Sequence, residues 1–286
     1  MKEETKEKIK GFRQSLDTSL KMLVKEMSEG KSERLMDLLD FAGKFHQYSF
    51  HNVMMAYMQR RDISKLAGVK TWNEVGRYIR KGEHGIAIWA PMFFKRSVKA
   101  EEEASEEAES VTFTRFRLVY VFDVSQTEGK ELPNTRISMI TGNPGTAYTA
   151  LESAIQAQEI VIDYVDHLSG NAEARSHGGK IEIVNDPDPA RLFKNLVHEF
   201  AHELLHHDGG ERGTITLRET EAEATAYVVC RHFGIETNAS DYIQLFDGNV
   251  KILSSRLERI RKTASTIIQA IEKESKIENP QIEQAA

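Results

Sequence analysis

Residues 196–202 read Leu-Val-His-Glu-Phe-Ala-His, and this stretch decides how the second half of the chain is interpreted. On an α-helix, residues i and i+4 share one face, so His198 and His202 can bind the same metal ion. Glu199 is poorly placed as a further ligand but well placed to take a proton from water as a general base. The stretch therefore predicts a metal site with His198 and His202 as ligands, Glu199 as the catalytic base and Zn²⁺ as the expected ion.

A catalytic zinc site takes three protein ligands and keeps one position open. The segment 218–227 offers three glutamates on an expected helix. Glu219 and Glu223 are four residues apart and share a face, whereas Glu221 points elsewhere. Alanines on both sides of Glu223 allow this helix to pack closely against the first. We therefore expect Glu223 to be the third ligand and Glu219 to be a capping, neighbouring or surface residue.

Two other side chains compete for a place at the metal. Asp208 lies at the spacing used by metallopeptidases with H-E-x-x-H-x-x-G-x-x-H/D, but position 205 is leucine where that pattern has glycine. His206 falls on the ligand face one turn after His202, and helix-end capping or a contact to a ligand is favoured over ligation for it. The residue that stabilises an oxyanion is open between Tyr227 and His177.

The chain is expected to have an α+β fold in two domains. In residues 1–135, amphipathic helices precede two apolar strands, at 85–90 and 111–124, joined by an acidic loop at 101–110. Pro133 and the Gly142–Gly145 cluster mark a boundary. Residues 145–275 carry a helix near 147–157, strands at 160–162 and 181–184, the metal-motif helix and a C-terminal helix from about residue 250. The tail, 276–286, is expected to be disordered.

Composition fits an ordinary globular protein, with 286 residues, 40% hydrophobic and 29% charged. No apolar run approaches the roughly 18 residues needed to span a bilayer. The N-terminus is charged and continues into an amphipathic pattern, unlike a signal peptide. Cys230 is the single cysteine, so no intrachain disulfide can form. A cytoplasmic protein without a membrane partner is expected.

The charge is unevenly distributed. Residues 1–100 contain 20 Lys and Arg against 12 Asp and Glu, although the whole chain has a net charge of −6. Basic residues in this part are interleaved with aromatic ones, as in proteins that bind single-stranded nucleic acid by a cationic groove and base stacking. Trp72 follows Thr71 in a pattern typical of a helix start, beside the basic turn at Arg80 and Lys81, and is the best stacking candidate. Trp89 and Phe93 are favoured as core residues of a strand.

Two resemblances become specific at this point. His198–His206 followed by Glu221–Tyr227 resembles the ImmA/IrrE family of zincin-like metallopeptidases, in which a glutamate corresponding to Glu223 completes the site. The first half resembles the N-terminal domain of the ArdC antirestriction family, which binds single-stranded DNA. The matching stretches are Tyr48–Asn52, Gly68–Gly76 with Thr71 and Trp72, Arg80–Ile88 and Val121–Gly129. The second half departs from the ArdC pattern because no tryptophan follows its second histidine.

Together these features predict a single-stranded-DNA-binding domain joined to a zincin-like metallopeptidase domain with an unknown peptide substrate. The resemblance implies a protein of a mobile genetic element that protects incoming DNA from host defences. The alternatives are a DNA-binding module with structural zinc and an ImmA-type peptidase that cleaves a repressor; a metal-dependent nuclease is disfavoured. The residues expected to contact DNA are Trp72, Arg77, Arg80, Lys81, Arg60, Arg61, Tyr48 and Asn52.

Overall fold

The computed structural model describes residues 3–29, 33–97, 110–131, 143–169, 172–207, 214–237 and 250–278. Its contacts divide the chain into two compact units. Unit 1 comprises Met1–Arg13 and Met55–Lys130, and unit 2 comprises Gln14–Met54 and Glu131–Ala286. Helices α1 (Glu3–Ser28) and α3 (Phe50–Gln59) contribute to both units, because the division falls within them.

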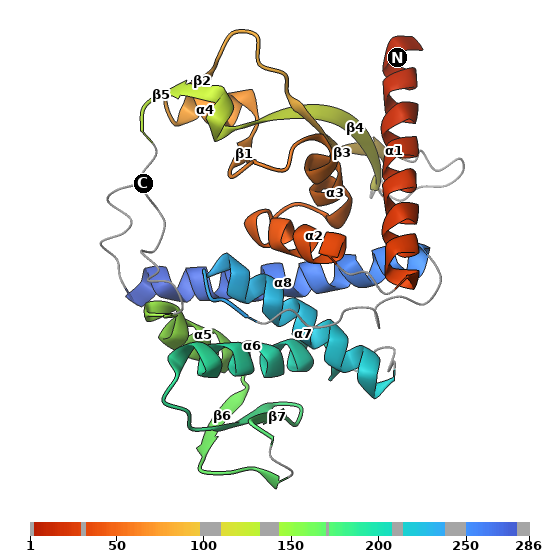
Figure 1. Ribbon diagram of the computed structural model, residues 1–286. Coiled ribbons are helices and arrows are strands. Elements are labelled where there is room, and N and C mark those ends of the chain that lie inside the picture. Colours follow the sequence, from red (N-terminus) through yellow and green to blue (C-terminus); the bar gives the residue numbers. More distant parts are fainter. Residues whose placement is uncertain are drawn as a thin grey trace, which may run out of the picture. The chain divides into compact units, whose positions relative to one another are not determined.

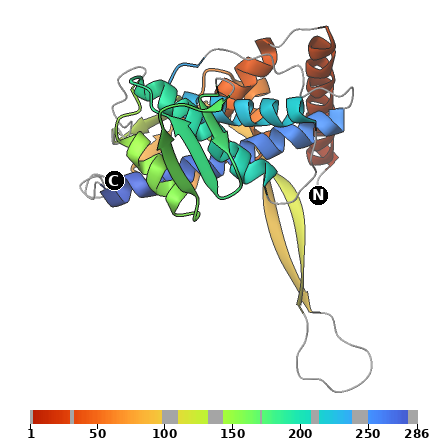
Figure 2. The same cartoon turned by 90° about the horizontal axis from the view of Figure 1, so that it is seen from below.

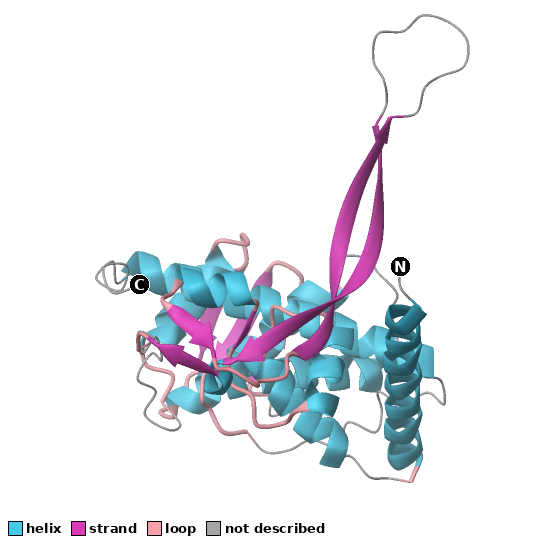
Figure 3. Ribbon diagram, turned by 90° about the horizontal axis from the view of Figure 1, so that it is seen from above, coloured by secondary structure: helices cyan, strands magenta, loops and turns pink. Residues whose placement is uncertain are grey.

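Unit 1 is built around a long antiparallel hairpin. Strand β3 (Ile86–Ser97) pairs with β4 (Ser110–Asp123) along its full length, from Ile86 opposite Val121 to Ser97 opposite Ser110. Figure 3 shows this pair as one long twisted ribbon. Strand β1 (Leu66–Ala67) pairs with the other edge of β4, and β2 (Arg77–Ile79) pairs separately with β5 (Thr127–Gly129). The expected antiparallel pairing on either side of the acidic loop is confirmed, while residues 101–109 of that loop lie outside the described residues.

A buried aspartate organises the turn that follows the hairpin. Asp123 has no exposed surface and accepts hydrogen bonds from the backbone N–H groups of Ser64, Lys65 and Ser125. Its own N–H donates to the side chain of Gln126, which completes a capping box for the short helix η1 (Val124–Gln126). Asp123 and Gln126, within the stretch Val121–Gly129, therefore have structural roles at this turn.

Unit 2 packs helices on a small mixed sheet. The sheet has the order β6-β8-β7, with β6 (Val161–Val165) parallel and β7 (Ala174–Ser176) antiparallel to β8 (Lys180–Val184). Helix α6 (Pro189–His206) lies against this sheet, beside α5 (Thr146–Gln156) (Figure 2). Helices α7 (Ile215–His232) and α8 (Val250–Glu278) pack on the side of α6 that faces away from the sheet (Figure 1). Helix α2 (Glu33–Lys44) packs against α7.

The metal-motif helix forms for reasons visible in its sequence. Asp188 caps it by accepting a hydrogen bond from the N–H of Ala190, and Pro189 fits the first turn because its missing N–H would have had no partner there. Phe193, Leu196, Val197 and Phe200 are at most 1% exposed and form the centre of the core. The expected strands and the helices near 147–157 and from residue 250 are all present.

The α+β prediction is confirmed, and three details differ from expectation. Helix α4 (Val69–Glu74) begins at Val69 with Gly68 as its N-cap, so Thr71 is not the residue that starts it. Helix α8 continues to Glu278, which places residues 276–278 of the expected tail in a helix; the remainder lies outside the described residues. Residues 14–54 group with unit 2, whereas the sequence-based limits place them in a domain of residues 1–135. That a domain of residues 1–135 folds independently stays a prediction. None of the described helices is long and apolar enough to cross a membrane.

Candidate functional site

Helix α6 brings its two histidines together. The Nε2 atoms of His198 and His202 are 3.1 Å apart, and the two ring centroids are 4.8 Å apart. Both side chains are mostly buried, with 18% and 12% of their surfaces exposed. In two neutral rings, the two Nε2 atoms would either face each other with their lone pairs or share one proton in an N–H···N hydrogen bond. A cation held between the two nitrogens gives both lone pairs a partner, so this arrangement suits a metal ion.

Glu219 of α7 completes the group. Its Oε2 lies 3.4 Å from Nε2 of His198 and 3.4 Å from Nε2 of His202. Two ligand atoms bound tetrahedrally at about 2.0–2.1 Å from zinc are roughly 3.3 Å apart. The three atoms therefore have the spacing of three corners of a tetrahedral site. The Glu219 side chain is 57% exposed, which leaves the fourth corner towards solvent.

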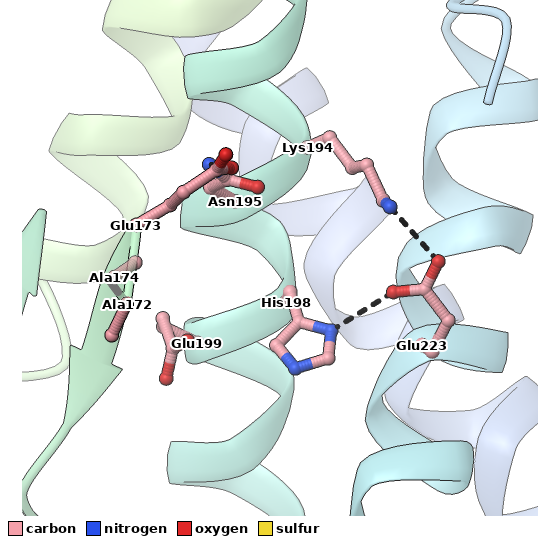
Figure 4. A pocket seen from close by; sticks show the side chains of 8 residues that line it. All are labelled: Ala172, Glu173, Ala174, Lys194, Asn195, His198, Glu199 and Glu223. Atoms are coloured by element: carbon pink, nitrogen blue, oxygen red, sulfur yellow. Dashed lines mark hydrogen bonds and ion pairs between the residues drawn. The ribbon is translucent and has the colours of Figure 1, made fainter. Parts of the chain in front are cut away.

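Glu223, the expected third ligand, lies elsewhere in the site. Its Oε2 is 3.2 Å from Nδ1 of His198, and its Oε1 pairs with Nζ of Lys194 at 2.9 Å (Figure 4). It thus contacts the ring nitrogen on the side away from the histidine pair. Glu219 and Glu223 share one face of α7, so the sequence could not separate them. The offset of α7 along α6 decides which one reaches the Nε2 atoms, and it favours Glu219.

His202 is held by a chain of buried polar groups. Its Nδ1 is 3.1 Å from Nδ1 of His206, and Nε2 of His206 is 3.2 Å from Oε2 of Glu221. Arg259 of α8 pairs with the same Glu221 oxygen at 3.4 Å. If Nε2 of His202 binds a metal, its Nδ1–H donates to His206, which in turn donates to Glu221. This contact agrees with the favoured role for His206, and it gives Glu221 a position that sequence reasoning missed.

Glu199 faces a small cavity of about 200 Å³ next to strand β7. Figure 4 shows its carboxylate between His198 and the segment that carries Ala172 and Ala174. Burial raises the pKa of Glu199, although the charges of His198 and His202 partly oppose this. A carboxylate with a raised pKa is a better proton acceptor, as a general base requires. Asp208 lies outside the described residues.

The charge at the centre is negative enough to bind protons when no metal is present. Burial alone would lower the pKa of His198, but hydrogen bonds to Glu219 and Glu223 raise it to about 9. Hydrogen bonds from His198 and His202 lower the pKa of Glu219. Neither candidate for the oxyanion role is turned to the cavity, because the Tyr227 hydroxyl donates to Asp40 and Nε2 of His177 contacts Glu182.

A second glutamate of α6 holds the turn between β7 and β8. Glu203 is 8% exposed and accepts hydrogen bonds from the Ser176 hydroxyl and from the N–H groups of Gly178 and Gly179, at 2.6, 2.8 and 2.7 Å. Both glycines have positive φ, +73° and +91°, where side chains are unfavourable. The Gly-Gly pair before a strand was the available signal for this turn, but nothing in the sequence connected it to Glu203.

Trp72 is a core residue of unit 1 and does not offer a face for base stacking. It is 4% exposed, and its indole N–H donates to the Phe122 carbonyl at 3.0 Å. Because α4 begins at Val69, Trp72 lies within the helix rather than at its exposed start. In this conformation the ring has no exposed face for a base, and a role of Trp72 in DNA binding stays a prediction. Asn52 of unit 2 is also buried, at 8% exposure, and Tyr48 of that unit is half-buried.

The expected basic residues of unit 1 differ in how much of their charge is paired. Arg77 donates to Thr127 and to the Lys130 carbonyl and so ties strands together. Arg60 and Arg80 both reach Ser125 and pair with Asp62 and Glu83, respectively. Lys81 is exposed, and the exposed Arg61 stacks on Tyr57 at 4.7 Å.

Three aromatic side chains of unit 1 are exposed, and none of them is among the residues expected to contact DNA. Tyr78 is 58% exposed at the centre of β2, and Phe116 and Tyr120 of β4 are 63% and 49% exposed. Residues four apart on a strand lie on the same face, so Phe116 and Tyr120 share one side of the hairpin. Side chains alternate between the two faces of β4, so the sequence places Phe116 and Tyr120 on one face. It does not show which of the two faces the core covers.

Comparison with known proteins finds a family likeness for the first part of the chain. Residues 9–122 match the family model described as the N-terminal domain of anti-restriction factor ArdC. This part of the chain is an ArdC-like N-terminal domain. The ArdC-like domain draws on both compact units, since its residues 14–54 belong to unit 2. The ImmA/IrrE resemblance of the second half stays a prediction.

Relatives and solved structures extend the likeness beyond the ArdC-like domain. An uncharacterized Bacillus anthracis protein, pXO2-81, is 24% identical over 284 residues, covering 84% of this chain and 48% of its own length. The chain thus spans about half the length of this relative. The metal-free crystal structure of antirestriction ArdC protein from plasmid R388 superposes with a TM-score of 0.54 and 14% identity, covering 90% of this chain and 98% of its own. The Mn(II)-bound structure of that protein superposes with a TM-score of 0.43 and 16% identity, covering 77% of this chain and 87% of its own. At these identities the likeness to the metal-free structure shows a shared fold only.

Proposed function

We propose that this chain binds single-stranded DNA through its ArdC-like domain and hydrolyses a peptide bond at a divalent metal centre, in the service of antirestriction for a mobile genetic element. The observation that carries the enzymatic part is the convergence of His198, His202 and Glu219 at 3.1–3.4 Å beside Glu199. The ArdC-like match of residues 9–122 supports the antirestriction part.

The donor set fits Zn²⁺. Two imidazole nitrogens and one carboxylate oxygen form a common ligand set of catalytic zinc sites, which keep a fourth position open. Glu223 and His206 contact the Nδ1 atoms of His198 and His202, as carboxylates and other polar groups commonly do at histidines that bind metals. The exposure of Glu219 leaves access from solvent, which a purely structural zinc does not need.

The residues around the cavity support a hydrolytic role. When bound, a zinc ion supplies Lewis acidity towards a carbonyl oxygen and towards water. Glu199 would accept a proton from the attacking water and return it to the leaving amine. Glu199 is partly buried and lines the cavity together with Ala172 and Ala174, while Lys194 and Asn195 add polar groups to the same lining.

The replacement Glu199→Gln tests this role because it retains size and removes the base. Peptidase activity and protection of DNA against restriction in cells should be lost, while zinc content and DNA affinity persist. Glu236→Gln serves as the matched control, since Glu236 is exposed and lies beyond the end of α7. If Glu199→Gln leaves both peptide cleavage and protection of DNA unchanged at equal expression, the metal is structural. Loss of a cleaved repressor, without loss of protection, would favour an ImmA-type regulatory peptidase.

The DNA-binding part rests on exposed aromatic and basic side chains of unit 1. Stacking of a base on an aromatic ring contributes about 1–3 kcal/mol, and Tyr78, Phe116 and Tyr120 offer exposed rings. Lys81 and Arg61 are exposed cations of the same unit. Phosphate contacts of this kind release counterions, so affinity should fall as salt rises.

Fluorescence anisotropy with a labelled oligothymidine tests this interface in the full chain. Tyr78→Ala and Lys81→Ala should each weaken binding, and only Lys81→Ala should reduce the salt dependence. Val75→Ala, a change of an exposed aliphatic residue just before β2, is the control. Equal affinity for duplex and single-stranded DNA would argue against a stacking site and for a general cationic surface.

A further inference from the structure

A second group of metal-ligating side chains in unit 2 consists of His46, His232 and Glu272. His46 follows α2, His232 is the last residue of α7, and Glu272 belongs to α8. One ligand atom from each lies within 4.8 Å of the others. The group brings together three segments that are distant in sequence, and the function proposed above does not use it.

This group is separate from the centre on α6. Glu223 and His232 are nine residues apart on α7, which corresponds to roughly 13 Å along a helix axis. Paired metal ions that share a catalytic site lie about 3.5–4 Å apart. The second group therefore cannot form a dinuclear centre with the first.

Hydrogen bonding determines the state of His232. Its Nδ1 is 2.9 Å from the Gly43 carbonyl oxygen, which only accepts, so Nδ1 carries a proton. Its Nε2 is 3.3 Å from Oε1 of Glu272, whose pKa is held low mainly by this same histidine. In the neutral ring, a lone pair of Nε2 would face a carboxylate oxygen. Nε2 of His232 and Oε1 of Glu272 would then repel each other unless a second ring proton or a metal ion lies between them.

His46 adds a neutral imidazole beside this contact. It is 5% exposed, and a neutral imidazole is the form of histidine that binds metals. The His46 and His232 rings meet edge to face, with centroids 4.9 Å apart. Nδ1 of His46 lies 3.4 Å from Oγ of Ser265, which also accepts a hydrogen bond from Gln269. Such a contact can hold the proton on Nδ1 and leave Nε2 for a ligand.

Two cations lie near the group and oppose a further positive charge. Arg261 donates to the His46 carbonyl at 2.7 Å, but Glu258 balances its charge at 2.8 Å. Lys276, one turn after Glu272, is exposed to solvent and therefore screened.

We propose that His46, His232 and Glu272 bind a structural Zn²⁺ ion that joins the end of α2 to α7 and α8. Two imidazole nitrogens and a carboxylate oxygen suit zinc, and an enclosed water molecule would take the fourth position of the tetrahedron. The burial of His46 gives no access for a substrate, so this ion would stabilise the fold without taking part in catalysis. Small side-chain movements would bring the ligand atoms from within 4.8 Å to tetrahedral spacing.

The test is zinc stoichiometry of the full chain after chelation and reloading, measured by elemental analysis. The unaltered chain should hold two zinc ions, Glu272→Gln one, and His198→Ala with His202→Ala one. The glutamine amide can donate to Nε2 of His232, so Glu272→Gln retains a hydrogen bond at this position. Glu274→Gln, two residues further along α8, is the matched control and should hold two.

Thermal unfolding gives a second readout that does not depend on the α6 centre. In the chain with His198→Ala and His202→Ala, added zinc should raise the unfolding midpoint, and adding Glu272→Gln should abolish the rise. A single zinc ion in the unaltered chain that persists in Glu272→Gln would overturn the proposal and identify a protonated His232 paired with Glu272. Absence of a zinc-dependent rise in the double variant would also overturn it.

Discussion

The choice between Glu219 and Glu223 as third ligand can be decided by measuring zinc affinity. Glu219 lies 3.4 Å from both Nε2 atoms, so Glu219→Ala removes one of three ligands. Glu223 contacts Nδ1 of His198 at 3.2 Å, so Glu223→Ala removes a group that orients a ligand. Loss of such an orienting contact typically costs about 10–100-fold in metal affinity. By the tenfold rule this is about 1.4–2.7 kcal/mol.

We therefore expect Glu223→Ala to fall within that range and Glu219→Ala to exceed it. Competition against a chromophoric zinc chelator, at fixed pH and with the full chain, measures both. Glu173→Gln is a suitable control, because Glu173 lines the same cavity but contacts Asn195 rather than a histidine. A larger loss for Glu223→Ala than for Glu219→Ala would refute the ligand assignment drawn from the geometry.

Three further outcomes are expected. Leu196→Ala, at a position with no exposed surface, should lower the free energy of unfolding by roughly 2–5 kcal/mol in chemical denaturation. Trp72→Phe should cost about 1 kcal/mol through loss of the indole hydrogen bond, without loss of DNA affinity; a selective loss of affinity would return Trp72 to the DNA site. Burial alone would raise the pKa of Asp123, but hydrogen bonds from Ser125, Ser64 and Lys65 hold it below its usual value. Its contribution to stability is thus present above about pH 4 and lost as pH falls towards the folded-state pKa, so the difference in stability between the unaltered chain and Asp123→Asn should narrow in acid.

The two metal ligands on α6 could be predicted from the sequence, but the residues of other elements that contact this helix could not. His198 and His202 are separated by one helical turn, and that spacing is a property of a single helix. The third ligand depends on how far α7 is displaced along α6, which no periodicity within either helix encodes. Glu203 and Glu221 were missed for the same reason, because each contacts a different element.

Trp72 illustrates a local ambiguity of another kind. Thr71 and Glu74 form a capping pattern, yet the backbone enters the helix two residues earlier, at Val69. That shift turns Trp72 towards the Phe122 carbonyl and converts an expected surface residue into a core residue. The strand pair around residues 85–124 was easier to predict, because alternating apolar residues on both sides of one loop define a hairpin without reference to any other element.

The hydrogen bonds of Glu203 have a consequence for motion around the cavity. The amide protons of Gly178 and Gly179 are bound by a carboxylate on the same helix that carries both histidines. Solvent exchange of these two protons requires the turn to separate from α6, so their exchange rates should follow those of the helix rather than those of an exposed loop. Helix α6, which carries the histidine pair, and the turn that follows β7 would then fluctuate as one body.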